Sequence, residues 1–340
     1  MKNESNLRPV LKWAGGKRSL LSEILEHVPT NSTRLIEPFV GGGAVLWAVK
    51  PNRALIGDLN SDLIGLYESI RNEPDAVIKE LKKLRRSLGD EKKLYENLTN
   101  RQINKKLDGF IEARPRQQKR LSKLRDLDAD TKRRKVRLEA WAVLFEEVRA
   151  WDRNPELLAR KTKAQLAARM IFLNHLGFNG LYRVNSKNQF NVPFGRYDKL
   201  DFFDESLIRS ISKYLSTTPS VKFFCQSFEK TISQSHKGDF IYADPPYAPL
   251  DNANSTFTSY TKDGFAFSDL ERLLDCLDEA AERGSQWLLS NVKSKETENL
   301  FKSRNYVLTE VSVARPVNSD GNNRGNVIEY LVLPKSSRNR

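Results

Sequence analysis

The sequence predicts an α/β protein built around a parallel, doubly wound sheet, and two observations support this fold class. First, residues 31–69 read as strand, loop, helix, strand, loop, helix, with three glycines after the first strand and Asp58 ending the second. Second, short apolar runs of strand length recur at 221–225, 239–243, 286–290, 306–308 and 327–333. Amphipathic helices lie between several of these runs, as at 268–283, where the leucines share one face. Such alternation is typical of parallel strands joined by crossover helices.

The composition indicates a polyanionic partner. The chain has 340 residues, with 57 Lys and Arg against 43 Asp and Glu, and its formal net charge is +14. Each phosphate that a Lys or Arg contacts releases counterions, so a surplus of this size favours nucleic acid. The alternative is a charge that only confers solubility.

Metal, membrane and secretory classes are not expected. Cys225 and Cys276 form no CxxC pattern, and the three histidines lie at no metal-ligand spacing from a cysteine or from one another. No apolar run approaches the roughly 18 residues that span a membrane, and the N-terminus has no apolar signal core. We expect a metal-free protein of the reducing cytoplasm.

A segment of different composition separates the two halves of the predicted sheet. Residues 79–137 are rich in Lys and Arg, favour helix and contain few β-branched residues. Residues 101–137 alone hold fourteen Lys and Arg against five Asp and Glu. We expect a helical insertion at about 85–140, such as a hairpin of charged helices. Its basic face either follows a nucleic-acid backbone or is simply solvated.

The strongest chemical signal is the Asp-Pro-Pro-Tyr turn at 244–247, directly after an apolar strand. A carboxylate at the carboxyl end of a parallel strand lies where ligands bind in open α/β sheets. Neither Pro245 nor Pro246 has an N–H, so the turn is stiff and presents its carbonyls. An exocyclic amino group has two N–H donors, which Asp244 and the Pro245 carbonyl can accept while Tyr247 stacks on the ring. The motif therefore indicates chemistry on a planar amine, with an ordinary capped turn as the alternative.

Two weaker signals indicate a nucleoside cofactor. Residues 37–43, Glu-Pro-Phe-Val-Gly-Gly-Gly, form a glycine loop between strand and helix, and Asp58 ends the next strand. Glycines allow close backbone approach, and a downstream acid can accept ribose hydroxyls. The loop has neither GxGxxG spacing nor a Walker lysine, which favours a nucleoside without a pyrophosphate. Residues 11–17, Leu-Lys-Trp-Ala-Gly-Gly-Lys, are a third motif, whose spacing does not fit a P-loop.

Residues 177–197 predict a β-hairpin that could reach nucleic acid. Polar and apolar residues alternate about a tip at 186–188. Basic and amide side chains at such a tip can contact base edges and phosphates.

In this order, the motifs resemble those of the α-group of amino-specific DNA methyltransferases, and most closely the DNA adenine methylase (Dam) family, which methylates GATC. The resemblance extends from Leu11 to Leu333, apart from the insertion. It implies a Rossmann-like doubly wound methyltransferase sheet with an inserted helical and β-hairpin DNA-recognition domain. Residues 1–70 and 215–335 would form the catalytic domain that binds S-adenosylmethionine. Residues 71–214 would form the target-recognition domain, including the insertion.

The resemblance also implies roles for individual residues. The catalytic motif would be Asp244, Pro245, Pro246 and Tyr247. The cofactor would contact Trp13, Ala14, Gly15, Lys17, Glu37, Pro38, Phe39, Gly41, Gly43, Asp58, Ser227, Phe228 and Asp244, although some relatives have an acid where Ser227 stands. DNA would contact Lys12, Phe178, Asn179, Gly180, Leu181, Arg183, Asn185 and Pro193. Arg183 would read a guanine, and Phe178 and Asn179 would fill the gap left by the extruded adenine. Residues 257–265 resemble the loop that closes over the flipped base.

The implied function is transfer of a methyl group from S-adenosylmethionine to adenine N6 in duplex DNA, within GATC, by base flipping. The implied partner is double-stranded DNA, with neither metal nor membrane; relatives often act as monomers, and some belong to restriction–modification systems with an endonuclease. Cytosine-N4 methylation is a rival, although serine is commoner than Asp244 in the first position of that motif. Methylation of RNA or of a protein glutamine is another, although asparagine is usual there. A catalytically silent DNA-binding protein of the same fold is the alternative from a different class.

Overall fold

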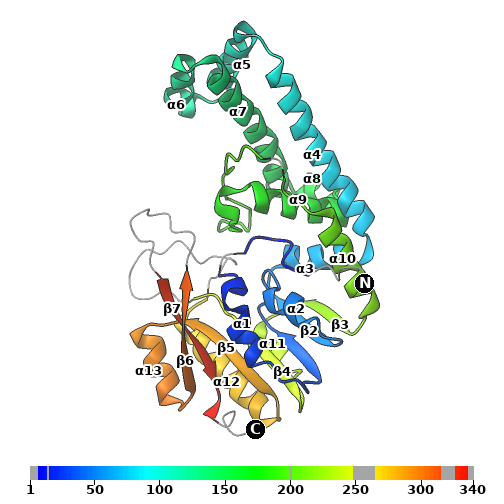
Figure 1. Ribbon diagram of the computed structural model, residues 1–340, viewed down its shortest axis with the longest axis vertical. Coiled ribbons are helices and arrows are strands. Elements are labelled where there is room, and N and C mark those ends of the chain that lie inside the picture. The colour runs from blue at the N-terminus through cyan, green and yellow to red at the C-terminus, as the bar shows by residue number, and fades with distance from the viewer. Residues whose placement is uncertain (1–6, 14, 200, 248–264, 315–325, 336–340) are drawn as a thin grey trace.

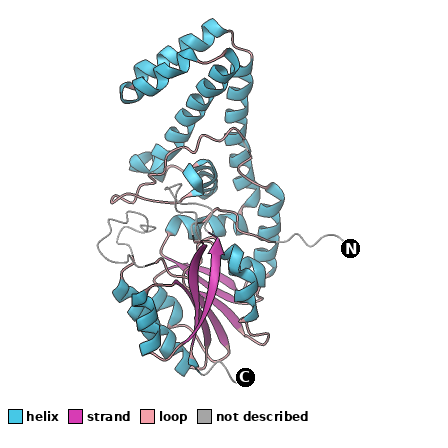
Figure 2. Cartoon of the chain, turned by 60° about the vertical axis from the view of Figure 1, so that its left-hand side comes forward, coloured by secondary structure: helices cyan, strands magenta, loops and turns pink. Residues whose placement is uncertain are grey.

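The computed structural model describes residues 7–13, 15–199, 201–247, 265–314 and 326–335 (Figure 1). Within these residues a seven-stranded sheet is covered by helices on both faces, as Figure 2 shows for the strands in the central layer. A helical part projects from this sheet, with α4 and α7 along its length (Figure 1). The predicted α/β class with a Rossmann-like sheet is confirmed.

The sheet is mostly, but not entirely, parallel. Its strands are β1 (Arg34–Glu37), β2 (Ala54–Asp58), β3 (Val221–Cys225), β4 (Asp239–Ala243), β5 (Gln286–Val292), β6 (Val307–Ala314) and β7 (Asn326–Leu333), in the order β3-β2-β1-β4-β5-β7-β6. Strands β1 to β5 pair in parallel as expected, whereas β7 runs antiparallel to β5 and β6. Only residues 315–325 separate β6 from β7, and a parallel crossover needs about a dozen residues or more. The short connection explains this difference from the expected parallel sheet.

Alternate residues along each strand divide between two hydrophobic cores. Leu35 of β1 packs on one face and its neighbour Ile36 on the other; Leu288 and Leu289 of β5 divide in the same way. The first face is covered by α1 (Leu21–Glu26), α2 (Ala44–Val49), α3 (Ser61–Asn72) and α10 (Glu205–Thr217), and the second by α11 (Phe228–Ile232), α12 (Phe267–Glu282) and α13 (Lys295–Ser303). Because both faces are covered, a site can open only at the strand ends.

The expected insertion is helical and has a core of its own. The helices between α3 and α10 are α4 (Pro74–Glu96), α5 (Asn100–Ala113), α6 (Gln118–Ser122), α7 (Ala129–Arg149), α8 (Pro155–Ala159) and α9 (Lys163–Leu176), with 3-10 turns η2 (Pro115–Gln117), η3 (Lys123–Asp126) and η4 (Ala150–Arg153). We call the projecting segment 74–149 the arm. Its outer half encloses Tyr95, Ile103, Leu107, Leu121 and Val136. The arm is more than a two-helix hairpin, because α5 packs on α7 and is followed by α6.

Local sequence signals set the starts of these helices. Thr99 and Gln102 form a capping box on α5, and Thr162 with Gln165 forms another on α9. The Asp128 carboxylate caps α7 by accepting the Thr131 N–H at 2.9 Å. Across the described ranges, no helix combines the length and apolar character that a membrane span requires.

Candidate active site

The expected site residues meet at the carboxyl ends of the parallel strands. Glu37 ends β1, Asp58 ends β2, and Asp244 follows β4. The N-terminal segment reaches the same edge, where the 3-10 turn η1 (Lys17–Leu20) begins. Its Lys17 contacts Tyr247, which lies 230 positions further along the chain. The three motifs recognised in the sequence therefore form one site.

The glycine loop is a close-fitting cradle beneath Trp13. Gly41 has a φ of +47°, and a Cβ added there would lie 2.6 Å from the indole nitrogen of Trp13. Gly43 has a φ of +70°, and its added Cβ would lie 2.7 Å from the indole nitrogen of Trp47. The Tyr67 hydroxyl donates to the Gly41 carbonyl at 2.8 Å. Glycine is therefore required at both positions, for backbone conformation and for space.

Two acids line this cradle, the buried Glu37 and the partly buried Asp58. One oxygen of Glu37, Oε1, is buried and has no hydrogen-bond partner in the described part of the chain. Burial raises the pKa of Glu37 to about 8, although the Leu46 N–H lowers it. Asp58 accepts the N–H groups of Gly41 at 3.1 Å and Asn60 at 2.9 Å, while burial raises its pKa to about 6. The cradle thus presents unsatisfied acceptor capacity, which costs free energy unless a ligand donor satisfies it.

A buried ammonium group organises the Asp-Pro-Pro-Tyr turn. Lys17 Nζ lies 2.7 Å from Asp244 Oδ1 and 3.5 Å from Glu329 Oε2. It also donates to the Gly15 carbonyl at 3.0 Å and the Tyr247 hydroxyl at 3.3 Å. Burial opposes the charge of Lys17, but Asp244 above all keeps its pKa well above the ordinary value. Lys17 is therefore a charged partner of the Asp-Pro-Pro-Tyr turn.

Glu329 completes this cluster from β7. Its side chain is 4% exposed, and its Oε1 accepts a hydrogen bond from the Tyr247 hydroxyl at 2.5 Å. Burial raises the pKa of Asp244 to about 6; Lys17 lowers it, and the negative charge of Glu329 raises it again. The pKa of the Asp244 carboxyl therefore lies closer to neutral pH than that of an ordinary aspartate.

We call residues 177–197 the recognition segment. One side-chain amide joins its start to the N-terminal segment. Asn174 is fully buried on α9; its Oδ1 accepts the Lys12 N–H at 2.8 Å, and its Nδ2 donates to the Lys12 carbonyl at 2.7 Å. The same Nδ2 donates to the Gly180 carbonyl at 2.9 Å. Gly180 has a φ of +64° and lies directly against the Lys12 side chain. Two predicted DNA contacts are therefore held side by side.

An exposed aromatic side chain stands at this point of the recognition segment. Phe178 is 46% exposed in the 3-10 turn η5 (Phe178–Gly180). Asn179 has a φ of +56°, and its N–H donates to the Tyr197 hydroxyl at 3.0 Å. A large exposed ring on a pinned backbone is what a wedge between base pairs requires.

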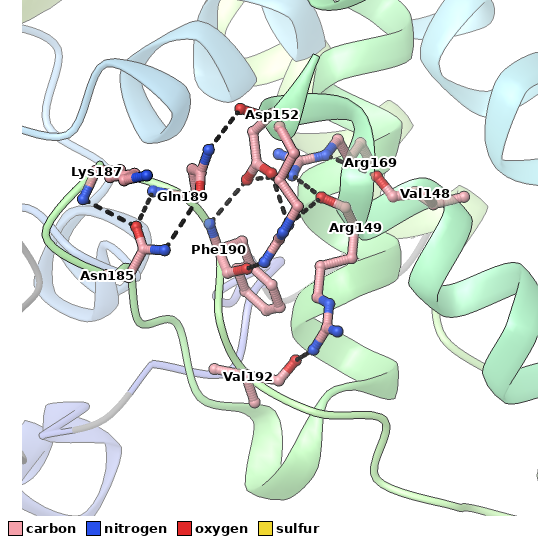
Figure 3. A network of polar contacts seen from close by, with 10 residues as sticks. Val148, Arg149, Asp152, Arg169, Asn185, Lys187, Gln189, Phe190 and Val192 are labelled. Atoms are coloured by element: carbon pink, nitrogen blue, oxygen red, sulfur yellow. Dashed lines mark hydrogen bonds and ion pairs between the residues drawn. The ribbon is translucent and has the colours of Figure 1, made fainter. Parts of the chain in front are cut away.

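The return side of the segment is bonded to the end of α7 and to η4 (Figure 3). Asp152 Oδ2 accepts the Phe190 N–H at 2.7 Å and the Arg169 guanidinium, also at 2.7 Å. Arg169 donates further to the carbonyls of Val148 at 3.1 Å and Arg149 at 3.0 Å. A buried guanidinium therefore fixes residues 177–197 to the helical part.

The tip of the segment is a turn rather than a ladder of paired strands. A single bridge, Val184 to Phe190, is present outside the named strands at this tip. Asn185 Oδ1 accepts the N–H groups of Lys187 and Gln189, each at 3.0 Å (Figure 3). Backbone hydrogen bonds also join the two sides, from Asn185 N to Gln189 O at 2.9 Å and from Asn191 N to Arg183 O at 3.0 Å, so the predicted hairpin is present and the Asn185 side chain shapes its tip.

The other expected residues are placed as follows. Arg183 donates through Nε to Asn191 Oδ1 at 2.9 Å, Leu181 is partly buried, and Pro193 is exposed. Phe39 packs on Phe228, with the centroids of the two rings 5.5 Å apart. The Ser227 hydroxyl caps α11 by accepting the Lys230 N–H at 3.4 Å. Pro38 and Pro245 are buried, and Pro246 is partly buried. Ala14 and residues 257–264 lie outside the described residues.

Three residues that contribute to the site were missed at the sequence level. Glu329 is a lone carboxylate within an apolar strand, and Asn174 directly follows the apolar run 170–173 of α9. Charged and polar groups in such settings are seldom buried without a partner, which is the signal that could have revealed them. Asp152 carried no comparable signal, because its surroundings in the sequence are polar.

Comparison with known proteins gives a consistent result. The family model described as D12 class N6 adenine-specific DNA methyltransferase matches residues 13–315. The type II methyltransferase M1.LlaDCHI of Lactococcus lactis subsp. cremoris is 35% identical over 331 residues, covering 97% of this chain and 96% of the relative. The DNA adenine methylases of Vibrio cholerae (classical strain O395) and Escherichia coli K12 are 32% and 30% identical, each covering 96% of this chain and 95% of the relative.

The Gly41→Ala substitution should destabilise the protein, because the new Cβ meets the Trp13 indole in a left-handed backbone conformation. We expect a loss of about 1–3 kcal/mol in the free energy of unfolding, measured by urea denaturation. The matched control is Gly65→Ala on α3, where an added Cβ meets no atom within 4 Å. The control should be neutral or slightly stabilising. Equal stability of both variants would contradict the close fit of the cradle.

Proposed function

The chain belongs to the D12 class N6 adenine-specific DNA methyltransferase family, and we propose that it uses S-adenosylmethionine to methylate adenine within GATC in duplex DNA. The observation that carries this proposal is the Asp244–Tyr247 turn at the end of β4, held by Lys17 and Glu329 beside the glycine cradle. In the proposed division of labour, residues 1–70 and 215–335 perform catalysis and residues 71–214 recognise the target. The family is adenine-specific, so the cytosine, RNA and protein alternatives are not retained.

The residues present fit S-adenosylmethionine. The unsatisfied Glu37 oxygen suits its ammonium group, Asp58 suits its ribose hydroxyls, and the glycine loop has no side chains that would obstruct it. We propose that it is held by Trp13, Ala14, Gly15, Lys17, Glu37, Pro38, Phe39, Gly41, Gly43, Asp58, Ser227, Phe228 and Asp244. The bound cofactor supplies a methyl group that its sulfonium already activates, so this chain has to position and polarise the target amine.

Asp244 and its two supports perform this task in the proposed mechanism. Lys17 occupies Oδ1 of Asp244, and no donor in the described part of the chain is bonded to Oδ2. We assign Oδ2 and the Pro245 carbonyl as acceptors of the two amine N–H groups. These bonds hold the nitrogen lone pair out of conjugation with the ring and towards the methyl donor. The hydrogen bond from Tyr247 to Glu329 fixes the aromatic ring that holds the base.

Recognition is proposed to come from residues 177–197 with Lys12. Arg183 has terminal amino groups beyond the Nε that binds Asn191, and bidentate contact of such groups with guanine is the commonest specific contact in the major groove. Phe178 is placed to enter the space of the extruded adenine, beside Asn179. Gly180, Leu181, Asn185 and Pro193 complete the proposed DNA surface. We further propose action as a monomer, and pairing with a restriction endonuclease like that of type II relatives.

Replacing Asp244 by alanine should abolish most turnover while retaining the cofactor. The amine would lose its charged acceptor, so we expect kcat to fall by about three orders of magnitude. Binding of S-adenosylmethionine, measured by calorimetry, should change by less than about tenfold, because the cradle is intact. Turnover close to that of the wild type in Asp244→Ala would remove this mechanism, and an inactive wild type would favour the silent DNA-binding alternative.

The pH profile should respond to the charge of Glu329. If Asp244 must be ionised, kcat/KM should decline as the pH falls through about 6, the pKa of its carboxyl. Glu329 raises that pKa, so Glu329→Gln should lower it and move the acid limb to lower pH. Glutamine can still accept the Tyr247 hydrogen bond, so the change is chiefly one of charge. Glu282→Gln, an exposed site at the end of α12, is the matched control and should leave the profile unchanged. An acid limb that stays in place or rises in Glu329→Gln would contradict the assignment.

Arg183→Ala should relax the preference for GATC. Loss of a bidentate guanine contact costs about 1–3 kcal/mol, so the rate ratio between GATC and a duplex altered only at its guanine should fall by about tenfold or more. Tritium transfer from labelled cofactor to the two duplexes measures this ratio. Equal labelling of both duplexes by the wild type would refute GATC while leaving adenine methylation intact.

A further inference from the structure

The arm carries two classes of basic side chain. Residues 101–137 contain fourteen Lys and Arg. Six have an acidic partner: Arg114, Arg120, Arg125, Arg133, Arg134 and Arg137. Among the side chains that the structure describes, the other eight form no ion pair, and six of these are exposed: Arg101, Lys105, Lys106, Arg116, Lys119 and Lys123. The first class holds the arm together, and the second leaves charge available to a partner.

Three of the exposed cations form one face of the segment η2–α6–η3. Arg116, Lys119 and Lys123 recur at intervals of three and four residues, which places them on the same side of a helical path. Leu121 lies on the opposite side, where it is fully buried in the core of the arm. We call the face of Arg116, Lys119 and Lys123 the arm patch. Its orientation away from the core means that it contributes nothing to the packing of the arm.

The arm patch is held at a fixed place relative to the recognition segment by Glu139 of α7. This carboxylate is 1% exposed, and its Oε1 accepts Arg120 of α6 at 2.8 Å and Arg196 of the recognition segment at 2.5 Å. Arg114 adds a third contact to Oε2 at 3.2 Å. Burial opposes ionisation of Glu139, but hydrogen bonds from Arg120 and Arg196 keep its pKa below the ordinary value.

Asp198 provides a second link between the arm and the recognition segment. It lies 3.3 Å from Arg134 and 3.8 Å from Arg137, both on α7. The arm is therefore joined at two acidic residues to the protein surface that is proposed to face DNA. Lys119 is the sequence neighbour of Arg120, which contacts the same Glu139 oxygen as Arg196, so this end of the arm patch lies near residues 177–197.

We propose that the arm patch binds backbone phosphates of the substrate duplex outside the recognition site. The proposal rests on the proposed function, since it takes duplex DNA held at residues 177–197 as its starting point. Phosphate contacts of this kind are independent of sequence, and they strengthen and orient binding without reading bases. An arm of this length with unpaired cations at its outer part extends the bound stretch of DNA beyond the target.

The test compares two duplexes that contain GATC, one of about 12 base pairs, little more than a helical turn, and one of about 40 base pairs. Affinity is measured by fluorescence anisotropy over a series of salt concentrations. The variant Arg116→Gln/Lys119→Gln/Lys123→Gln should bind the long duplex about tenfold or more weakly at about 0.1 M salt, with a salt slope reduced by about 2–3. On the short duplex the variant should match the wild type within about twofold.

The matched control is Arg53→Gln/Lys222→Gln/Lys237→Gln, three exposed cations of the sheet part that lie near the amino ends of β2, β3 and β4. It removes the same charge away from the site and should leave both the salt slope and methylation unchanged. An unchanged slope for the arm variant, an equal loss on both duplexes, or an equal loss in the control would overturn the proposal. A wild type that neither binds nor methylates either duplex would instead refute the proposed function.

Discussion

The candidate active site depends on one buried cation, the ammonium group of Lys17. It balances Asp244 at the end of β4 and Glu329 of β7, and it contacts the hydroxyl of Tyr247. Removing such charges from water costs several kcal/mol per ion, so each is tolerated only while its partners are present. Two acids without the lysine, or the lysine without the acids, would be unstable in the same place. The site can therefore form only when the N-terminal segment has docked on the finished sheet.

The fold and the motifs could be predicted from the sequence because their signals are local. Strand-length apolar runs and amphipathic helices are set by neighbouring residues, and so are the glycines that turn the chain after β1. The apolar runs alone do not predict that β7 is antiparallel to its neighbours. Its direction follows from the short connection between β6 and β7.

Side-chain contacts within the folded protein could not be predicted from the sequence. Lys17 is predicted to lie at the cofactor, and within the described residues it contacts Asp244, Tyr247, Glu329 and its own turn. Asn185 remains a predicted DNA contact, and its side chain also forms the turn at the tip of residues 177–197. Only the folded chain brings Lys17 near Asp244 and Tyr247, whereas the Asn185 side chain binds residues two and four positions further along. The basic insertion had the same ambiguity, because a count of charges does not distinguish Arg120, which is paired with Glu139, from Lys119, which is exposed.

The amide of Asn174 has a mechanical consequence. It holds both polar groups of the Lys12 peptide backbone and, through the same nitrogen, the carbonyl of Gly180. A shift of the N-terminal segment would therefore strain or break the hydrogen bond from Asn174 to the recognition segment. A shift of the recognition segment would likewise strain or break the hydrogen bonds from Asn174 to the N-terminal segment. Because such linkage is reciprocal, any free energy spent on ordering one of them is shared with the other. The N-terminal segment, proposed to hold the methyl donor, and residues 177–197, proposed to read the base sequence, thus share one anchoring side chain.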